Sequence, residues 1–250
     1  MAKKQLPKTA IPELIAKLRT LYPDAKTELD HKNPFELLAA TILSAQTTDK
    51  RVNMVTPVLF AKYPDAQALA KAEQLAVEDI VRTTGFYRNK AKSIIGMAKA
   101  LVERHQGEVP RTLAELIKIP GAARKTANVV LGAAFGLAEG VVVDTHVQRL
   151  SQLIGLTRHD DVKDIEQDLM KLIPQADWVD FSHFLILHGR RVCIARAPQC
   201  DVCPLNDLCQ SAFDPKVGYV PASAKAAKPS KKKVVVETKA IRAARAKARR

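Results

Sequence analysis

Aromatic residues are scarce in this sequence, and it contains no long apolar run. Phe, Trp and Tyr make up only 5% of the 250 residues, whereas hydrophobic residues as a class reach 47%. A buried core must therefore consist mainly of Leu, Ile, Val and Ala, a composition that favours helices. No stretch of about 18 apolar residues is present, which argues against a membrane-spanning helix. Because Met1–Pro7 contains no apolar signal core, we expect a cytoplasmic, nucleoid-associated protein with no membrane partner.

Cysteine is also scarce, and its distribution is uneven. The four cysteines are Cys193, Cys200, Cys203 and Cys209, separated by six, two and five residues. A chain of this length can bury its own core and needs no disulfide framework, so such close thiolates suit one metal centre. Structural zinc usually uses two short Cys-x2-4-Cys pairs, whereas here one Cys-x2-Cys pair lies between two more distant cysteines. The spacing favours a 4Fe–4S cluster, with zinc and unliganded thiols as the alternatives.

Acidic residues are nearly absent from the C-terminal segment. Residues 222–250 contain eleven Lys or Arg and one acid, Glu237, so this segment carries +10 of the net charge of +14. An Ala/Lys/Arg-rich segment without an apolar stripe is predicted to be disordered. It would serve as a non-specific tether to a polyanion such as DNA or RNA, with a merely solubilising tail as the alternative.

Strand-like sequence is limited to Val141–Val143, which is too short and isolated to form a sheet. Helical spacing recurs instead, first in the apolar residues of segment 11–18. Further helices are predicted near residues 34–45, 49–61, 75–83, 88–105, 112–118, 124–135, 145–154, 162–173 and 178–192. The pattern predicts an all-α protein.

A very short turn joins two helical segments within Ile119–Ala127. Pro120 ends the first helix, and Gly121 relieves the backbone strain of the turn. Because the second helix begins at once, its free N–H groups and the positive end of its dipole form an anion site that suits a DNA phosphate. Many such connections bind nothing, so a purely structural turn stays open as the alternative.

Two polar residues stand at the starts of predicted helices. Lys125 lies one turn into the second helix, where it is either an ordinary surface lysine or a functional amine. Asp144 follows the three valines and opens the next helix, a position that an N-cap explains well. If both side chains faced one cleft, they would form a nucleophile and its electrostatic partner.

Five motifs occur in a characteristic order along the chain. They are Leu43–Asp49, the Ile119–Ala127 turn, Val143–Val147, Leu187–Arg190 and the Cys-x6-Cys-x2-Cys-x5-Cys loop. Together they resemble the endonuclease III type of base-excision DNA glycosylase, a branch of the helix-hairpin-helix superfamily with a cluster loop. The resemblance extends over residues 7–212.

The resemblance implies an all-α fold of two helical lobes that flank a DNA-binding cleft. Residues 1–30 would supply an N-terminal helix that packs with the cluster lobe. Residues 31–138 would form a six-helix barrel with the helix-hairpin-helix motif at about 112–135, and residues 139–213 would form the iron–sulfur cluster lobe. Residues 214–250 would be the basic tail.

The resemblance also assigns roles to individual residues. Lys125 matches the catalytic lysine of the family, and Asp144 matches its catalytic aspartate. Gln46 matches the residue that fills the space left by the extruded base, and Phe86 falls where relatives usually carry an aliphatic wedge. The expected DNA-binding residues lie in these two positions and in the hairpin; they are Gln46, Phe86, Gly121, Ala123 and Arg124.

The implied activity is that of a bifunctional DNA glycosylase and AP lyase. It would remove oxidised pyrimidines and cleave the 3′ side of the abasic site by β-elimination through a lysine Schiff base. The partner would be double-stranded DNA with damaged bases or abasic sites, and we expect a monomer. A free lysine is almost fully protonated at pH 7, so we expect burial at the helix N-terminus to lower the pKa of Lys125. Asp144 would take a proton or stabilise the cationic sugar.

The cluster is expected to do no chemistry on the base. It would close the loop 193–209 so that Arg190, Arg191 and Arg196 meet phosphates. Arg149 would contact either DNA or an intramolecular ion-pair partner, and His183 and His188 are interpreted as packing residues.

Ala123 departs from the family pattern, because relatives usually have glycine at both ends of the hairpin turn. If position 123 needed a positive φ, alanine would cost roughly 1 kcal/mol there. We expect phosphate binding to survive this change.

Two other functions compete with the glycosylase–lyase. An adenine-mismatch glycosylase shares the hairpin and the cluster but usually lacks the hairpin lysine and has an additional C-terminal domain. A non-catalytic iron–sulfur DNA-binding or sensor protein is the second alternative. The presence of both Lys125 and Asp144 argues against each of them.

Overall fold

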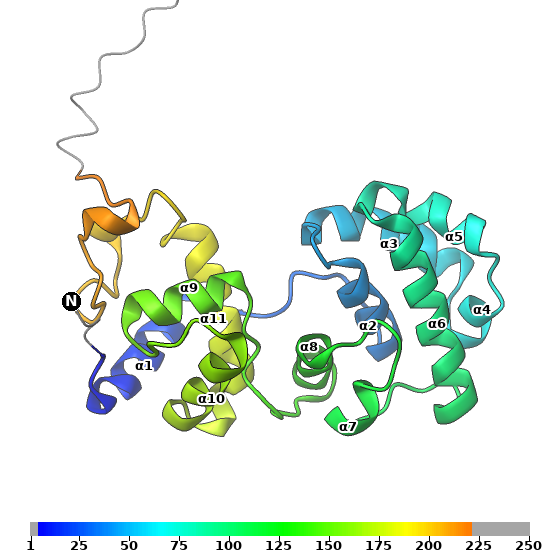
Figure 1. The fold of residues 1–250 in the computed structure, drawn as a ribbon, viewed down its shortest axis with the longest axis horizontal. Helices are drawn as coiled ribbons and strands as arrows, with labels where there is room; N and C mark the ends of the chain where they lie inside the picture. Colours follow the sequence, from blue (N-terminus) through cyan, green and yellow to red (C-terminus); the bar gives the residue numbers. More distant parts are fainter. Residues whose placement is uncertain (1–4, 222–250) are drawn as a thin grey trace, which may run out of the picture. The chain divides into compact units, whose positions relative to one another are not determined.

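The computed structural model describes residues 5–221, so the predicted basic tail lies, from residue 222 on, outside the described residues. The described part of the chain is built from helices and contains no strand, which confirms the all-α prediction (Figure 1). Val141–Val143 is irregular backbone that leads into a helix. Within residues 5–221, no helix is both long and apolar enough to cross a bilayer.

The predicted helices are all present, with ends shifted by a few residues. The α-helices are α1 (Ile11–Leu21), α2 (Pro34–Leu43), α3 (Asp49–Lys62), α4 (Ala66–Ala70), α5 (Gln74–Val81), α6 (Tyr87–His105), α7 (Leu113–Leu116), α8 (Arg124–Phe135), α9 (Thr145–Ile154), α10 (Val162–Leu172) and α11 (Trp178–Arg191). Short 3-10 turns are η1 (Lys8–Ala10), η2 (Arg82–Thr84), η3 (Gln175–Asp177), η4 (Cys200–Val202) and η5 (Pro215–Val217). The short helix α4 was not predicted from the sequence.

Side-chain caps define where several helices begin. At α2, the side chain of Asn33 accepts a hydrogen bond of 2.9 Å from the backbone N–H of Glu36. The Glu36 carboxylate in turn accepts one of 2.7 Å from the backbone N–H of Lys32. Pro34 occupies the first helical position, where its missing N–H costs nothing. These local bonds satisfy donors that the helix itself leaves free.

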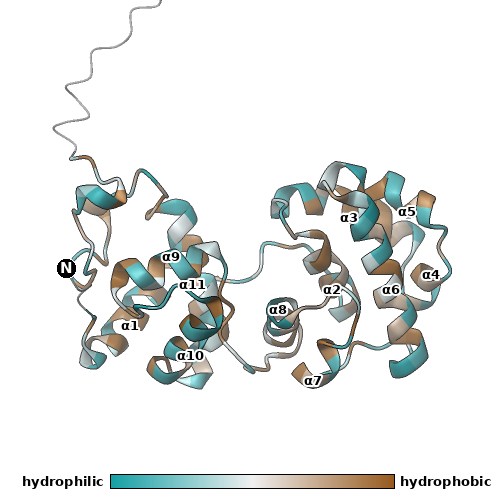
Figure 2. Ribbon diagram, viewed as in Figure 1, coloured by the Kyte–Doolittle hydropathy of each residue, from teal (hydrophilic) through white to brown (hydrophobic). Residues whose placement is uncertain are grey.

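The buried apolar side chains form two separate clusters. The first draws on α2 to α8 and includes Leu38, Leu59 and Leu101. The second draws on α1, α9, α10 and α11 and includes Leu14 and Phe181. Figure 2 shows hydrophobic stretches in brown on helix faces that lie toward neighbouring helices, with hydrophilic stretches in teal on other faces. Helix α1 thus packs against α11, far from it in sequence. The division of the chain at residues 30, 138 and 213 stays a prediction.

An ion pair between an exposed arginine and a buried carboxylate connects helices that belong to the two clusters. Arg124 at the start of α8 donates hydrogen bonds of 3.0 Å from both Nε and Nη2 to the carboxylate of Glu166 on α10. Asn128 adds a bond of 3.2 Å to the same carboxylate, whose side chain is only 8% exposed. Gly140 leaves room for these side chains, because a Cβ there would overlap both Glu166 and Asn128. A buried carboxylate needs such partners to offset the loss of water.

A second charged contact connects α11 to α3. Arg190 donates from Nη2 to Asp49, the first residue of α3, at 2.9 Å, and it also pairs with Glu28. Both carboxylates remain partly exposed, so this contact is weaker than the pair at Glu166.

In the hairpin between α7 and α8, the one residue with a left-handed backbone conformation is a glycine, Gly121. Gly121 has a φ of +81°, and a Cβ added there would lie 3.2 Å from both Ile42 Cγ2 and Ser93 Cβ. Ala123, the N-cap of α8, has a φ of −69° and a ψ of 168°. The condition for strain at Ala123 is therefore not met, because alanine adopts this extended conformation freely.

Gly121→Ala is expected to lower the free energy of unfolding by about 1–2 kcal/mol, because alanine is disfavoured at positive φ. The matched control is Ala123→Gly, which should change it by less than about 0.5 kcal/mol because glycine is a suitable N-cap. Urea denaturation of the cluster-loaded proteins, followed by circular dichroism, measures both. Equal destabilisation by the two variants would contradict this account of the turn.

Candidate functional site

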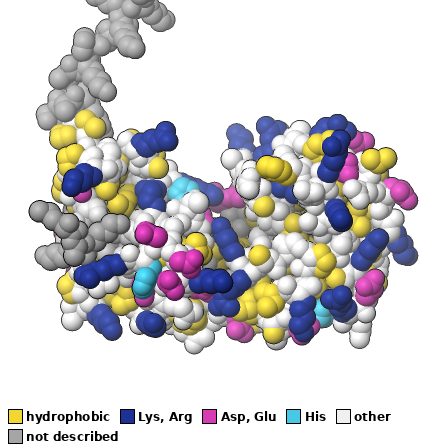
Figure 3. Space-filling model, in the orientation of Figure 1, with side chains coloured by type: hydrophobic (Ala, Val, Ile, Leu, Met, Phe, Trp, Pro, Cys, Tyr) yellow, Lys and Arg dark blue, Asp and Glu magenta, His cyan; other side chains and the backbone are white. Residues whose placement is uncertain are grey.

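A cavity of about 330 Å³ lies where the elements of the two apolar clusters meet. Gln46, Lys125 and Asp144 all line it, so the structure brings together three predicted site residues from different parts of the chain. Its size falls in the range of about 300–1,000 Å³ that is usual for ligand pockets. Figure 3 shows Lys and Arg side chains in dark blue beside the hollow between the two halves of the molecule.

Asp144 has two functions in the structure. Its Oδ1 accepts hydrogen bonds of 2.8 Å from the backbone N–H groups of His146 and Val147, which makes it the N-cap of α9. The same half-buried side chain lines the cavity. Oδ2 takes part in no hydrogen bond within residues 5–221, so it remains available to a group inside the cavity. Asp144 therefore both caps α9 and lines the cavity, and its catalytic role stays a prediction.

Lys125 is the second residue of α8, where it lies close to the positive end of the helix dipole. Its neighbours Thr126 and Val129 line the same cavity. The side chain is exposed, so the burial that we expected for Lys125 is wrong for the free protein. The amine faces the cavity from a helix start, but the protein alone does not remove it from water.

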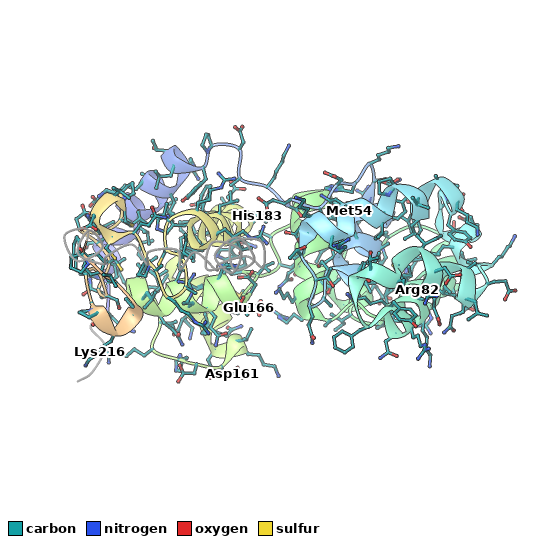
Figure 4. The ribbon with its side chains drawn as sticks, turned by 90° about the horizontal axis from the view of Figure 1, so that it is seen from above. Met54, Arg82, Asp161, Glu166, His183 and Lys216 are labelled. Atoms are coloured by element: carbon teal, nitrogen blue, oxygen red, sulfur yellow. The ribbon has the colours of Figure 1, made fainter. Side chains whose placement is uncertain are left out.

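One face of α11 forms the opposite side of the cavity. His183, Ile186, Leu187 and Arg190 all line it, at the i, i+3, i+4, i+7 spacing of a helix face. Burial lowers the pKa of His183, so its imidazole is neutral near pH 7. Figure 4 shows His183 where the two halves of the molecule meet. The packing interpretation of His183 is thus incomplete. The helical spacing of His183, Ile186, Leu187 and Arg190 is a signal that the sequence analysis did not use.

The expected wedge residues lie in two loops with unusual backbone. Gln46 has a φ of 53° and Phe86 a φ of 46°, both in the left-handed region. Phe86 is 67% exposed, a large fraction for an aromatic ring, and does not line the cavity. Such conformations are rare in residues other than glycine and cluster at functional sites.

The remaining predicted DNA contacts surround the hairpin. Gly121 and Ala123 are exposed, as an anion site requires. Arg124 is held in its ion pair with Glu166, and its side chain is 45% exposed. Contacts of these three residues with DNA stay predictions.

The four cysteines line one cavity, whose remaining walls are mostly apolar side chains such as Leu150, Ile154 and Leu205. Within residues 5–221, no three His, Cys, Asp or Glu side chains converge closely enough to hold one metal ion. Zinc needs four ligands within about 2.3 Å of a single point, whereas a cluster has four separate irons. The arrangement therefore fits a cluster better than zinc.

Burial makes the negatively charged thiolate form of these cysteines unfavourable unless a positive charge lies nearby. It raises the pKa of the Cys193 and Cys203 thiols, and that of Cys209 to about 11. Thiolates in such a cavity require a cation, which iron supplies. Arg149 adds a further positive charge, since it donates to the Cys193 carbonyl at 2.7 Å and lies 3.6 Å from the Cys193 sulfur. Arg149 therefore serves the cysteine loop, a third role beside the two that the sequence left open.

His188 connects the cysteine loop to α1. Its Nδ1 lies 2.9 Å from the hydroxyl of Tyr22, and its Nε2 lies 3.4 Å from the sulfur of Cys203. Burial lowers the pKa of His188 to about 4, so the ring is neutral and one nitrogen carries the proton. The packing interpretation of His188 holds, with an added contact to a cluster ligand.

Comparison with known proteins gives matches along most of the chain. A family model described as "HhH-GPD superfamily base excision DNA repair protein" matches residues 39–175, and another, "Iron-sulfur binding domain of endonuclease III", matches residues 193–209. Endonuclease III of Synechocystis sp. (strain ATCC 27184 / PCC 6803 / Kazusa) is 56% identical over 200 residues, which cover 80% of this chain and 91% of that protein.

Two solved structures are similar in fold and sequence. One is described as a non-covalent endonuclease III–DNA complex, and it aligns with a TM-score of 0.78 over 83% of this chain and 97% of its own. The other is described as a trapped endonuclease III–DNA covalent intermediate, with a TM-score of 0.79 over 83% of this chain and 98% of its own. Both are 44% identical to this chain.

The chain carries a 4Fe–4S cluster, and the match over residues 193–209 falls on the four cysteines that are the predicted ligands. The match over residues 39–175 contains the hairpin and the cavity residues Gln46, Lys125 and Asp144. Fold, cavity, cluster loop and relatives agree, and the chain belongs to the endonuclease III family of helix-hairpin-helix base-excision DNA glycosylases.

Proposed function

We propose that this protein is a bifunctional DNA glycosylase and AP lyase that removes oxidised pyrimidines from double-stranded DNA. The observation that carries the proposal is the single cavity lined by Lys125, Asp144 and Gln46. An amine, a carboxylate and a space-filling amide are the groups that the reaction needs in one place. The relative described as a trapped covalent intermediate with DNA supports a covalent route.

Extrusion of the damaged nucleotide comes first, because the enzyme cannot reach a stacked base. Rotation out of the duplex costs a few kcal/mol, and least where damage has weakened the pair. Gln46 would fill the vacated space, and the exposed ring of Phe86 would stack as a wedge on the opened strand. The preference for oxidised pyrimidines within this proposal is taken from the resemblance to the family.

The hairpin would hold the DNA backbone during extrusion. The exposed turn at Gly121 and Ala123 leaves the first N–H groups of α8 free for a phosphate. The exposed part of the Arg124 guanidinium would also contact the phosphate, while the side chain stays paired with Glu166. Lys125 follows directly, so phosphate binding would place the sugar near the amine.

Lys125 would then act as the nucleophile. The lone pair of the neutral amine forms a bond to C1′, the glycosidic bond breaks, and the base leaves with its electron pair and gains a proton. Ring opening gives a Schiff base, and loss of a C2′ proton with departure of the 3′ phosphate cuts the strand. Because Lys125 is exposed in the free protein, the DNA itself would exclude water from the amine.

Asp144 would take the proton that Lys125 must lose and stabilise the cationic sugar in the transition state. Its Oδ1 is occupied by two backbone N–H groups, which fix the carboxylate, while Oδ2 has no hydrogen bond among the described residues. A fixed carboxylate reorganises little during the reaction, which is the condition for efficient charge stabilisation.

Cys193, Cys200, Cys203 and Cys209 would hold the cluster away from the reacting sugar. When bound, the cluster supplies structural closure of the loop 193–209 rather than chemistry on the base. Arg196 in this loop and Arg191 at the end of α11 would then meet DNA phosphates, whereas Arg190 is paired with Asp49 and Glu28. As a monomer, the protein would present one such site to the duplex.

Lys125→Ala is expected to abolish covalent trapping. Within residues 5–221 one other lysine lines the cavity, Lys26, but it lies in the connection between α1 and α2 and not at a helix start. Borohydride reduction with a duplex that contains thymine glycol should give a protein–DNA adduct with the wild type and none with the variant. Lys118→Ala, an exposed lysine near the hairpin, should trap as the wild type does. Binding of the duplex without any adduct in the wild type would contradict the proposal and favour a sensor.

Asp144→Asn should separate catalysis from capping. Asparagine caps a helix as well as aspartate, so the free energy of unfolding should change by less than about 0.5 kcal/mol. The rate of base removal in single-turnover assays should fall about 10²- to 10⁴-fold, because the proton acceptor is lost. Asp161→Asn, at the N-cap of α10, is the control and should leave this rate unchanged. An unaltered rate in Asp144→Asn would remove the carboxylate from the mechanism.

Cys203→Ala is expected to prevent stable assembly of the cluster. The purified variant should contain little iron and inorganic sulfide, should melt at a lower temperature, and should bind duplex DNA more weakly at fixed salt concentration. Elemental analysis, thermal unfolding and fluorescence anisotropy measure these three effects. Full retention of iron, or zinc in place of iron in the wild type, would contradict the assignment of the four ligands.

A further inference from the structure

Lys90 is a buried lysine that the proposed reaction does not use. It lies in the first turn of α6, and only 5% of its surface is exposed. Within residues 5–221 it has no carboxylate partner, and burial lowers the pKa of its amine. Burial of an unpaired ammonium is costly, and the N-terminal turn of a helix is an unfavourable place for positive charge. A lysine at this position therefore costs stability and calls for a compensating function.

The amine of Lys90 connects two loops that are far apart in sequence. It donates a hydrogen bond of 2.6 Å to the hydroxyl of Thr47 and one of 2.7 Å to the backbone carbonyl of Thr84. The Thr47 hydroxyl also donates to the carbonyl of Thr84. These three groups form a closed hydrogen-bonded triangle between the two loops.

Each loop carries one of the proposed wedge residues next to this triangle. Gln46 directly precedes Thr47, and Phe86 follows Thr84 by two residues. The backbone N–H of Lys90 also donates to the carbonyl of Phe86 at 3.1 Å. One residue thus contacts the Phe86 loop through both its backbone and its side chain, and the Gln46 loop through its side chain.

Both wedge residues adopt a conformation that needs support. A left-handed φ costs a residue other than glycine roughly 1–2 kcal/mol, and such a conformation persists only where surrounding contacts determine it. Gln46 and Phe86 are exposed, so their own side chains make few contacts that could supply this support. The two loops are bridged by the Lys90 bonds to Thr47 and Thr84 and by the bond from Thr47 to the Thr84 carbonyl.

We propose that Lys90 is a positioning residue that couples the Gln46 and Phe86 loops into one preorganised wedge pair for nucleotide extrusion. The inference rests on the proposed function, in which these two side chains enter the duplex. Fixed spacing between the wedges lets both engage the DNA in one step, so that neither loop has to be ordered while the base pair opens.

Lys90 is not itself a rival nucleophile to Lys125. Its side chain does not line the cavity that contains Lys125 and Asp144. Its amine is also committed to two short hydrogen bonds in the protein interior. A sugar carbon cannot approach it without opening both loops.

The principal variant is Lys90→Met, which keeps the length of the side chain and removes the charge and both side-chain hydrogen bonds. Methionine at a buried site should leave the urea midpoint of unfolding equal to or above that of the wild type, because an unpaired charge is no longer buried. Lys92→Met is the matched control, an exposed lysine on the same helix. Lys90→Arg tests rescue, since arginine retains the charge and donors at this position.

Base opening is read by the fluorescence of 2-aminopurine placed beside thymine glycol in a duplex. Lys90→Met should lose the fluorescence rise on binding and should remove the lesion from the duplex about 100-fold more slowly. It should cleave a single-stranded abasic oligonucleotide at the wild-type rate, because no pair has to be opened there. Lys92→Met should match the wild type throughout, and Lys90→Arg should recover part of the fluorescence rise.

Three outcomes would overturn the inference. They are wild-type 2-aminopurine fluorescence in Lys90→Met, an equal slowing on single-stranded and duplex substrates, and a lowered urea midpoint with parallel loss of both activities, as a purely structural role predicts. If Lys90→Met does not fold, Thr47→Val removes at nearly constant shape the hydroxyl that accepts from Lys90 and donates to the Thr84 carbonyl. This variant should reduce the duplex rate and the fluorescence in the same way, and no effect would overturn the inference.

Failure of the proposed function would look different. A wild type that opens the duplex but forms no adduct on borohydride reduction contradicts the Lys125 mechanism. The comparison of Lys90→Met with Lys92→Met still stands in that case, because the fluorescence of 2-aminopurine requires no chemistry.

Discussion

The ion pair between Arg124 and Glu166 is the contact on which the site depends. It joins the start of α8, where Lys125 lies, to α10, which belongs to the apolar cluster of the half that carries Asp144. The Glu166 carboxylate is 8% exposed, so loss of the arginine would leave a buried charge without its partner. The two groups that the proposed reaction needs come from different parts of the fold. This pair connects those parts, together with the contacts of Arg190 to Asp49 and Glu28.

The free protein is organised for a reaction that only DNA can complete. Asp144 is already fixed by two backbone hydrogen bonds, and the proposed wedge loops are held by contacts that include a buried amine. Lys125, in contrast, is exposed. Desolvation of the nucleophile would then be coupled to binding of the duplex, so that the amine becomes reactive only when a sugar is present. The four cysteines line a different cavity from the one that contains Lys125 and Asp144, and a cluster held there would stabilise the loop that follows α11.

Sequence reasoning identified the helices, the cysteine centre and the resemblance from which Lys125 and Asp144 were assigned, since these depend on local spacing and on motifs. It failed where the outcome depends on tertiary contacts. The burial predicted for Lys125 did not occur, because none of the residues 5–221 covers the start of α8 at that point. Arg149 bonds the cysteine loop across 44 positions, and Lys90 bonds Thr47 across 43, separations that no periodicity reveals. The strain considered for Ala123 depended on its backbone φ, which the identity of a residue does not determine. The φ of −69° in the structure is one that alanine adopts without strain.

The central claim is that the amine at position 125 forms the covalent bond to the sugar. Its most direct test is mass spectrometry of the borohydride-reduced complex after digestion of both the protein and the DNA. The account predicts one modified peptide, with the deoxyribose remnant on Lys125. A remnant on Lys90, on another lysine or on the N-terminal amine would contradict it.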